Sequence, residues 1–229
     1  MEAAEPGQFV EDLKRSIKSS EYALVKSPFV RGVAAGTLTP AQLKGWALQD
    51  YQYRRHVPQL AATRFVKCTD PKIRHELFET LIEEGTGAIT GSAGHTDLFL
   101  DQARELGASL EELEAAEPLP ETAAHVYWAE LILHTKPWFI ALSAQLGGEG
   151  QVPEYAPLLV KGFREHYELS DRGVRFWTVH EEADKDHGGV VEEMIARFAV
   201  TDELQNEMRS IVRTKLRLLY GMWNTIKYF

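Results

Sequence analysis

The chain is nearly free of cysteine, and it has neither a long apolar run nor an excess of basic charge. A single cysteine among 229 residues excludes a disulfide within the chain and is typical of a reducing compartment, so we expect a cytoplasmic protein. No apolar run approaches the roughly 20 residues that a membrane-spanning helix needs. The start lacks the basic-then-apolar pattern of a signal peptide. A formal net charge of -9 argues against nucleic-acid binding by bulk electrostatics.

The hydrophobic periodicity is helical almost throughout, and no segment alternates as a half-buried strand does. Helices are expected over residues 9–20, 40–66, 71–84, 95–106, 109–116, 121–146, 153–167, 169–198 and 201–228. Pro58 and Pro137 lie inside two of these stretches, where a proline kinks a helix. Because every connection is short, we expect one all-α domain over residues 1–229, a bundle of about seven main helices.

Three potential metal ligands lie in the middle of one expected helix: His180, Asp184 and His187. At about 100° per residue, positions i, i+4 and i+7 fall within roughly 60° of one another. They share their stripe with apolar residues typical of a core-facing surface, such as Phe176 and Met194. Buried carboxylates are rare unless they are paired or bind a metal. The stripe predicts either a buried polar network or half of a metal site, and three polar groups together favour the metal.

Glu83 and Glu84 end another expected helix and differ in the face that they occupy. Glu84 shares its face with Leu77 and Leu81, so we expect it to point inward. Glu83 falls on the polar side of the same helix, so we expect it to be solvated. Glu84 is therefore the first candidate for a further metal ligand.

Two more candidate donors lie beside loops. His95 follows the glycine-rich segment 85–94 and can turn back toward the preceding helix. Glu149 lies just before a helix, where a carboxylate is also stabilised by the helix dipole alone. Glu130 and His134 form a competing pair four residues apart, which we interpret mainly as a surface pair.

The type of donor narrows the choice of metal. Carboxylates with imidazoles and no thiolate suit iron or manganese better than structural zinc. A carboxylate-bridged dinuclear centre inside a helical bundle is a natural use of six such donors.

The order of these donors resembles that of the heme-oxygenase-like diiron oxidases and oxygenases, in the superfamily that also contains the TenA, PqqC and CADD proteins. The pattern of that group is a Glu and a His, a later Glu, and then His-x3-Asp-x2-His on a third helix. The thirty residues between the later Glu and this motif fit the usual separation. The matching residues are Glu84, His95, Glu149, His180, Asp184 and His187.

The resemblance implies a heme-oxygenase-like fold and activation of O2 by two iron ions, or by one iron and one manganese ion. It also implies a small-molecule substrate in a biosynthetic pathway, such as an amino acid or a fatty acid. An external electron donor and a homodimer are compatible with it. From the facing of the helices, Tyr53, His56 and Trp128 are candidates to line the substrate pocket.

The spacing of the first two ligands departs from the pattern. The family usually has six residues between its first Glu and His, which would place the ligand at Ala88. Ten residues separate Glu84 from His95, with the extra length in the glycine-rich segment. Glu83 therefore remains an alternative ligand.

Two alternative functions stay open. CADD-type enzymes make 4-aminobenzoate from their own tyrosine, for which Tyr22 and Tyr53 are candidates here. Those enzymes carry a Tyr beside the middle Glu and another four residues before the third-helix His, where this chain has Gly148 and Phe176. The second alternative is a metal-free binding protein of the PqqC or TenA type, against which the nearly complete ligand set argues.

Overall fold

The computed structural model describes residues 3–229, except the side chains of residues 181–188. Every regular element in this part of the chain is a helix, so the predicted all-α class is confirmed. The seven helices of fourteen or more residues are α1 (Pro6–Ser19), α3 (Pro40–Arg54), α5 (Pro71–Thr86), α8 (Pro120–Thr135), α10 (Val152–Tyr167), α11 (Asp171–Phe198) and α12 (Asp202–Trp223). The shorter ones are α2 (Pro28–Ala35), α4 (Val57–Lys67), α6 (His95–Glu105), α7 (Leu110–Ala115) and α9 (Trp138–Leu142). Short 3-10 turns are η1 (Leu24–Lys26), η2 (Ser143–Gly147), η3 (Glu149–Gln151) and η4 (Asn224–Tyr228). None of the described helices combines the length and the apolar character that crossing a membrane requires.

Helix starts follow the local sequence. The Thr39 hydroxyl accepts a hydrogen bond from the backbone N–H of Gln42, whose side chain accepts one from the Thr39 N–H, so a complete capping box opens α3. Ser109 and Glu112 form the same arrangement at α7. These caps satisfy backbone donors that a helix leaves without intrahelical partners.

Two stretches predicted as single helices are each divided at a proline. The stretch 40–66 consists of α3 and α4, with Pro58 in the first turn of α4. The stretch 121–146 consists of α8 and α9, with Pro137 between them, and continues as 3-10 turns up to Glu149. A proline inside a helix loses a hydrogen bond and clashes with the preceding turn, whereas in the first turn it costs nothing. The predicted continuous helices were therefore wrong at these two points.

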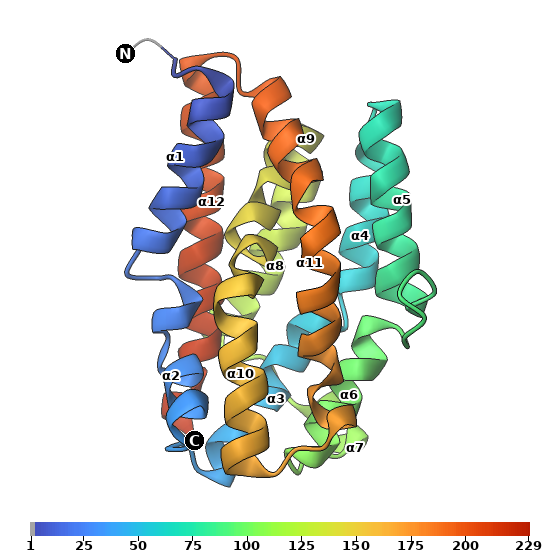
Figure 1. Cartoon of the computed structure of the whole chain (residues 1–229), viewed down its shortest axis with the longest axis vertical. Helices are drawn as coiled ribbons and strands as arrows, with labels where there is room; N and C mark the ends of the chain where they lie inside the picture. The colour runs from blue at the N-terminus through green and yellow to red at the C-terminus, as the bar shows by residue number, and fades with distance from the viewer. Residues whose placement is uncertain (1–2) are drawn as a thin grey trace.

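In Figure 1, α1 and α12 lie on one side of the molecule and α4 and α5 on the other, with α8, α10 and α11 between them. An aromatic core joins these layers, and its rings pack face to face or edge to face. Trp46 stacks on Phe29 with ring centroids 4.2 Å apart, and Trp223 lies edge-on to Trp46 and to Trp177. All of these side chains are fully buried. This core fixes α3, α11 and α12 against one another and directs their polar side chains into a common interior.

Candidate functional site

Three of the predicted ligands converge from three helices. Glu84 lies near the end of α5, His95 is the first residue of α6, and His180 lies on α11. One ligand atom from each lies within 4.8 Å of the others. The rings of His95 and His180 have centroids 4.5 Å apart. The predicted ligands Asp184 and His187 lie outside the residues whose side chains the structure describes.

His95 is buried, yet neither of its ring nitrogens has a hydrogen bond. Its Nδ1 lies 3.1 Å from Glu84 Oε2, and its Nε2 lies 3.5 Å from Glu83 Oε1. Burial disfavours the charged ring, but Glu84 and Glu83 outweigh burial and raise the pKa of His95 above its usual value. Buried polar atoms normally have partners, so two orphaned ring nitrogens facing carboxylates fit a cation held between these groups.

His180 has the tautomer that a metal ligand needs. Its Nδ1 lies 2.6 Å from the carbonyl oxygen of Phe176, one turn earlier on the same helix. Because a carbonyl only accepts, Nδ1 carries the proton and Nε2 keeps a free lone pair. Burial, and then the charge of His95, lowers the pKa of His180 to about 4. The ring is therefore neutral near pH 7, which metal binding requires.

Glu84 is held in its charged form. Burial raises the pKa of its carboxyl group, but His95, then His180 and Arg54, lower it below its usual value. The Arg54 guanidinium is itself fixed, because its Nε donates to Asp50 Oδ2 at 2.8 Å. An ionised carboxylate beside two imidazoles is a donor set that suits iron.

Glu83 is buried, so the prediction that it is solvated was wrong. Its carboxylate accepts hydrogen bonds from the backbone N–H groups of Ile89 and Thr90, at 3.0 and 3.1 Å, and from the Thr90 hydroxyl. Glu83 thereby closes the glycine-rich loop, whose first turn needs Gly87 at a φ of 64°. A helical projection of α5 alone cannot show that this loop folds back over the polar face.

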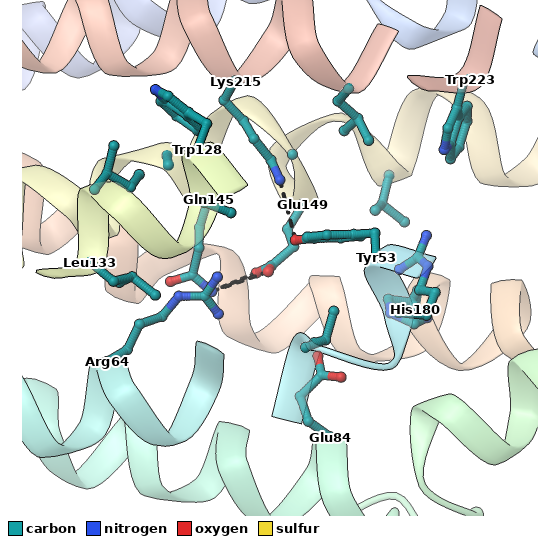
Figure 2. Close-up of a pocket in the computed structure, with 18 of the residues that line it drawn as sticks. Tyr53, Arg64, Glu84, Trp128, Leu133, Gln145, Glu149, His180, Lys215 and Trp223 are labelled. Atoms are coloured by element: carbon teal, nitrogen blue, oxygen red, sulfur yellow. Dashed lines mark hydrogen bonds between the residues drawn. The ribbon is translucent and has the colours of Figure 1, made fainter. Parts of the chain in front are cut away.

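A cavity of about 70 Å³ lies beside this cluster, with Glu84 and His180 in its wall. Glu149, the first residue of η3, lines the same cavity and accepts two hydrogen bonds from the side-chain amide of Gln145, at 3.1 and 3.0 Å (Figure 2). One water needs only about 10–15 Å³ by the same measure, so the cavity has room for several water molecules or for a small ligand.

Two of the three residues predicted to line the pocket do so, and the third does not. Tyr53 and Trp128 are in the wall of the cavity (Figure 2). His56 is not among its lining residues, since it lies in the turn between α3 and α4 and its Nδ1 faces Glu130 Oε1 at 3.3 Å. His134, which was paired with Glu130 on the sequence, is exposed.

The sequence reasoning missed two buried residues of the same interior, Lys215 on α12 and His125 on α8. The Lys215 Nζ lies 2.8 Å from His125 Nε2 and 3.2 Å from the Tyr53 hydroxyl. Burial, and then the charge of Lys215, holds the pKa of His125 well below its usual value, so the ring is neutral and accepts the hydrogen bond. The sequence feature that could have identified Lys215 is its position on the apolar stripe of α12, between Val212 and Leu219.

Comparison with known proteins identifies the family and the fold of the chain. The sequence profile of a family described as iron-containing redox enzymes matches residues 44–220. A 4-aminobenzoate synthase of Nitrosomonas europaea is 30% identical over 200 residues, which cover 83% of this chain and 80% of that protein. A 4-aminobenzoate synthase of Chlamydia pneumoniae is 25% identical over 221 residues, covering 96% and 94%. A crystal structure from Shewanella denitrificans, described as a domain of unknown function with a heme oxygenase-like fold, superposes with a TM-score of 0.75 at 22% identity, covering 96% of this chain and 90% of that one. The chain therefore has the heme-oxygenase-like fold.

Proposed function

Because this chain belongs to a family of iron-containing redox enzymes, we propose that it is an O2-dependent oxidoreductase with two iron ions that acts on a small metabolite in a biosynthetic pathway. The observation that carries this proposal is the convergence of Glu84, His95 and His180, with ligand atoms within 4.8 Å of one another. The geometry of His95 supports it, because its two ring nitrogens face the carboxylates of Glu84 and Glu83 without a well-aligned hydrogen bond to either.

The proposed ligands are Glu84, His95, Glu149, His180, Asp184 and His187. Glu149 belongs to the same cavity wall as Glu84 and His180, although it is not part of the three-residue cluster. When bound, iron would supply the electrons that activate O2. Manganese in one of the two positions suits the same oxygen and nitrogen donors.

The residues around the cluster orient the proposed ligands and form part of an apolar wall. The carbonyl of Phe176 orients the ring of His180, and the amide of Gln145 orients the carboxylate of Glu149. Phe176, Trp177, Trp223 and Tyr155 also line the cavity. An apolar wall of this kind limits the access of water to a reactive centre.

A second candidate function is 4-aminobenzoate synthesis from a tyrosine of the chain. The two relatives described above are named 4-aminobenzoate synthases, and Tyr53 lies in the cavity wall beside Glu149. Tyr22 is the weaker source, because it packs edge-on against Tyr220 and does not line the cavity. The identities of Gly148 and Phe176, where the resemblance would place tyrosines, favour the general oxidoreductase.

The test is to load the metal-free chain with Fe(II) without oxygen, measure the bound iron, and then follow O2 consumption. We expect two irons per chain and consumption of O2. His56→Ala is the matched control, because His56 lies outside the cavity and should leave both readouts unchanged. Absence of stoichiometric iron would discard the ligand set and favour a metal-free binding protein.

Further readouts separate the remaining possibilities. Intact mass after turnover distinguishes self-modification at Tyr53 from reaction on an external substrate. Turnover with and without an external reductant tests whether an electron donor is needed. Light scattering tests the proposed homodimer.

A further inference from the structure

The end of the cavity formed by α12 holds a buried cation, Lys215, that has no counterion among the side chains described by the structure. Lys215 is only 7% exposed, and its side chain lines the cavity. Among the residues whose side chains are described, no carboxylate lies within 4.0 Å of its Nζ. Burying a charge without an opposite charge is costly, so proteins seldom retain such a lysine without a use for it.

The hydrogen bonds of Lys215 leave donors free for a ligand. An ammonium group has three N–H donors, and two of them are directed at the Tyr53 hydroxyl and at His125 Nε2. Tyr53 accepts from Lys215, so its own O–H remains available to donate. The side-chain oxygen of Gln145 in the same cavity is also buried without a partner. This end of the cavity therefore offers an N–H and an O–H donor side by side.

Two glycines at the end of η2, Gly147 and Gly148, leave room for the side chain of Lys215. A Cβ placed on Gly148 would lie 3.0 Å from Lys215 Cε, and one on Gly147 would lie 3.3 Å from its Cβ and Cγ. Any larger residue at Gly148 would push the lysine stem aside. These two glycines form the groove in which the side chain of Lys215 reaches the cavity.

The charged residues of the cavity wall indicate whether a ligand would be an anion or a cation. Among the residues whose side chains are described, the carboxylates of this wall are Glu84 and Glu149, both proposed here as metal ligands, and its cations are Arg54, Arg64 and Lys215. Arg54 is paired with Asp50, whereas Arg64 and Lys215 have no carboxylate partner among the side chains that the structure describes. In Figure 2, Lys215 and Glu84 enter the cavity from opposite sides. Because the described partners of Lys215 are Tyr53 and His125 and not a carboxylate, this end of the wall keeps its positive charge whether or not metal occupies Glu84 and Glu149.

We propose that the substrate is a small carboxylic acid whose carboxylate is bound by the Lys215 ammonium and the Tyr53 hydroxyl, with its carbon chain directed toward the cluster of Glu84, His95 and His180. Apolar wall residues such as Val57, Ile132 and Leu219 fit such a chain. The inference rests on the proposed function for the reaction that follows binding, but the recognition of the anion needs no iron.

The test compares binding of straight-chain carboxylates of two to eight carbons with binding of the amides of the same length. Tryptophan fluorescence reports binding, because Trp128, Trp177 and Trp223 line the cavity. We expect at least one carboxylate, such as hexanoate, to bind the metal-free full chain about tenfold or more tightly than its amide, as one charge-assisted contact allows. Lys215→Met should abolish this preference, and Lys215→Arg should retain part of it. Lys161→Met, which removes an exposed charge, is the matched control.

Several outcomes overturn the inference. Equal binding of carboxylates and amides, absence of any carboxylate binding, or a preference that survives Lys215→Met would each do so, as would hexyl phosphate binding more tightly than hexanoate. A structural role predicts that Lys215→Met lowers the melting temperature, whereas removal of an uncompensated charge should maintain or raise it. If carboxylates bind but the chain does not load iron, the proposed function is wrong and the anion site remains. If the chain loads iron but carboxylates do not bind, the anion site is wrong and the proposed function remains.

Discussion

Two clusters of polar residues, one beside each end of the cavity, contain similar residues with opposite partners. At one end His180 and His95 face the carboxylate of Glu84, and at the other end His125 faces the ammonium of Lys215. The first end presents lone pairs and negative charge, so it suits a cation. The second presents N–H and O–H donors and positive charge, so it suits an anion. Similar side chains thus acquire opposite binding properties from the charge that each neighbour carries.

The largest expected difference between the two ends is in iron binding. If roughly 10–16 kcal/mol of metal-binding energy is shared by four ligands, each contributes about 2.5–4 kcal/mol. His180→Ala should therefore weaken iron binding by roughly 100-fold. Lys215→Met should leave the bound iron unchanged, because Lys215 belongs to the opposite end. Iron per chain, measured after anaerobic loading and gel filtration, checks both variants.

Iron retention by His180→Ala would contradict the assignment of the metal end. Loss of iron in both variants would mean that the two ends are not independent. Circular dichroism spectra of the metal-free variants serve as the control for correct folding.

The sequence predicted the metal end better than the anion end, for a physical reason. His180 belongs to a ligand motif with helical spacing, Glu84 follows from the facing of its helix, and His95 follows from its place directly after the glycine-rich segment, so neighbouring residues in the sequence were enough. Lys215 contributes only when α12 packs against α3 and α8, and its partners are 90 and 162 residues away in the chain. No local pattern encodes such a meeting.

The helical projection failed where the chain folds back on itself. It predicted that Glu83 is solvated, because it considered only the residues of α5. The glycine-rich loop instead returns over that face and donates hydrogen bonds from Ile89 and Thr90 to the Glu83 carboxylate. The all-α class followed from periodicity, but the divisions at Pro58 and Pro137 depended on where in a helix a proline is tolerated.

Because His180 and His125 are neutral in the folded chain, lowering the pH should decrease its free energy of unfolding. His180 has a pKa of about 4 in the folded chain, against about 6.5 when unfolded, so protons favour the unfolded state between these values. The contribution of His180 is nearly complete at pH 6.5 and is lost as the pH falls, by roughly 1.5 kcal/mol between pH 6.5 and pH 5. His125, whose pKa is also lowered, adds to the loss in the same direction. Urea unfolding of the metal-free chain at pH 6.5 and pH 5 measures the sum.

Single variants show how much of this loss in unfolding free energy comes from His180 and how much from His125. His180→Gln and His125→Gln should each reduce the difference in unfolding free energy between the two pH values. His95 acts in a different range, because its raised pKa gives stability that is present below pH 6.5 and lost above it. A difference that remains complete in both variants would show that neither ring is neutral in the folded chain.

The smallest expected effect belongs to the hydroxyl of Tyr53. Tyr53→Phe removes one donor to the bound carboxylate and one acceptor from Lys215, so hexanoate should bind about fivefold more weakly, or by about 1 kcal/mol. Tyr51→Phe is the matched control, because Tyr51 lies two residues away on α3 and does not line the cavity. Fluorescence titration of both variants measures the change, and iron binding should stay the same. If Tyr53→Phe abolished turnover altogether while hexanoate still bound within this factor, the tyrosine itself would be the reactant. The second candidate function, 4-aminobenzoate synthesis, would then replace the first.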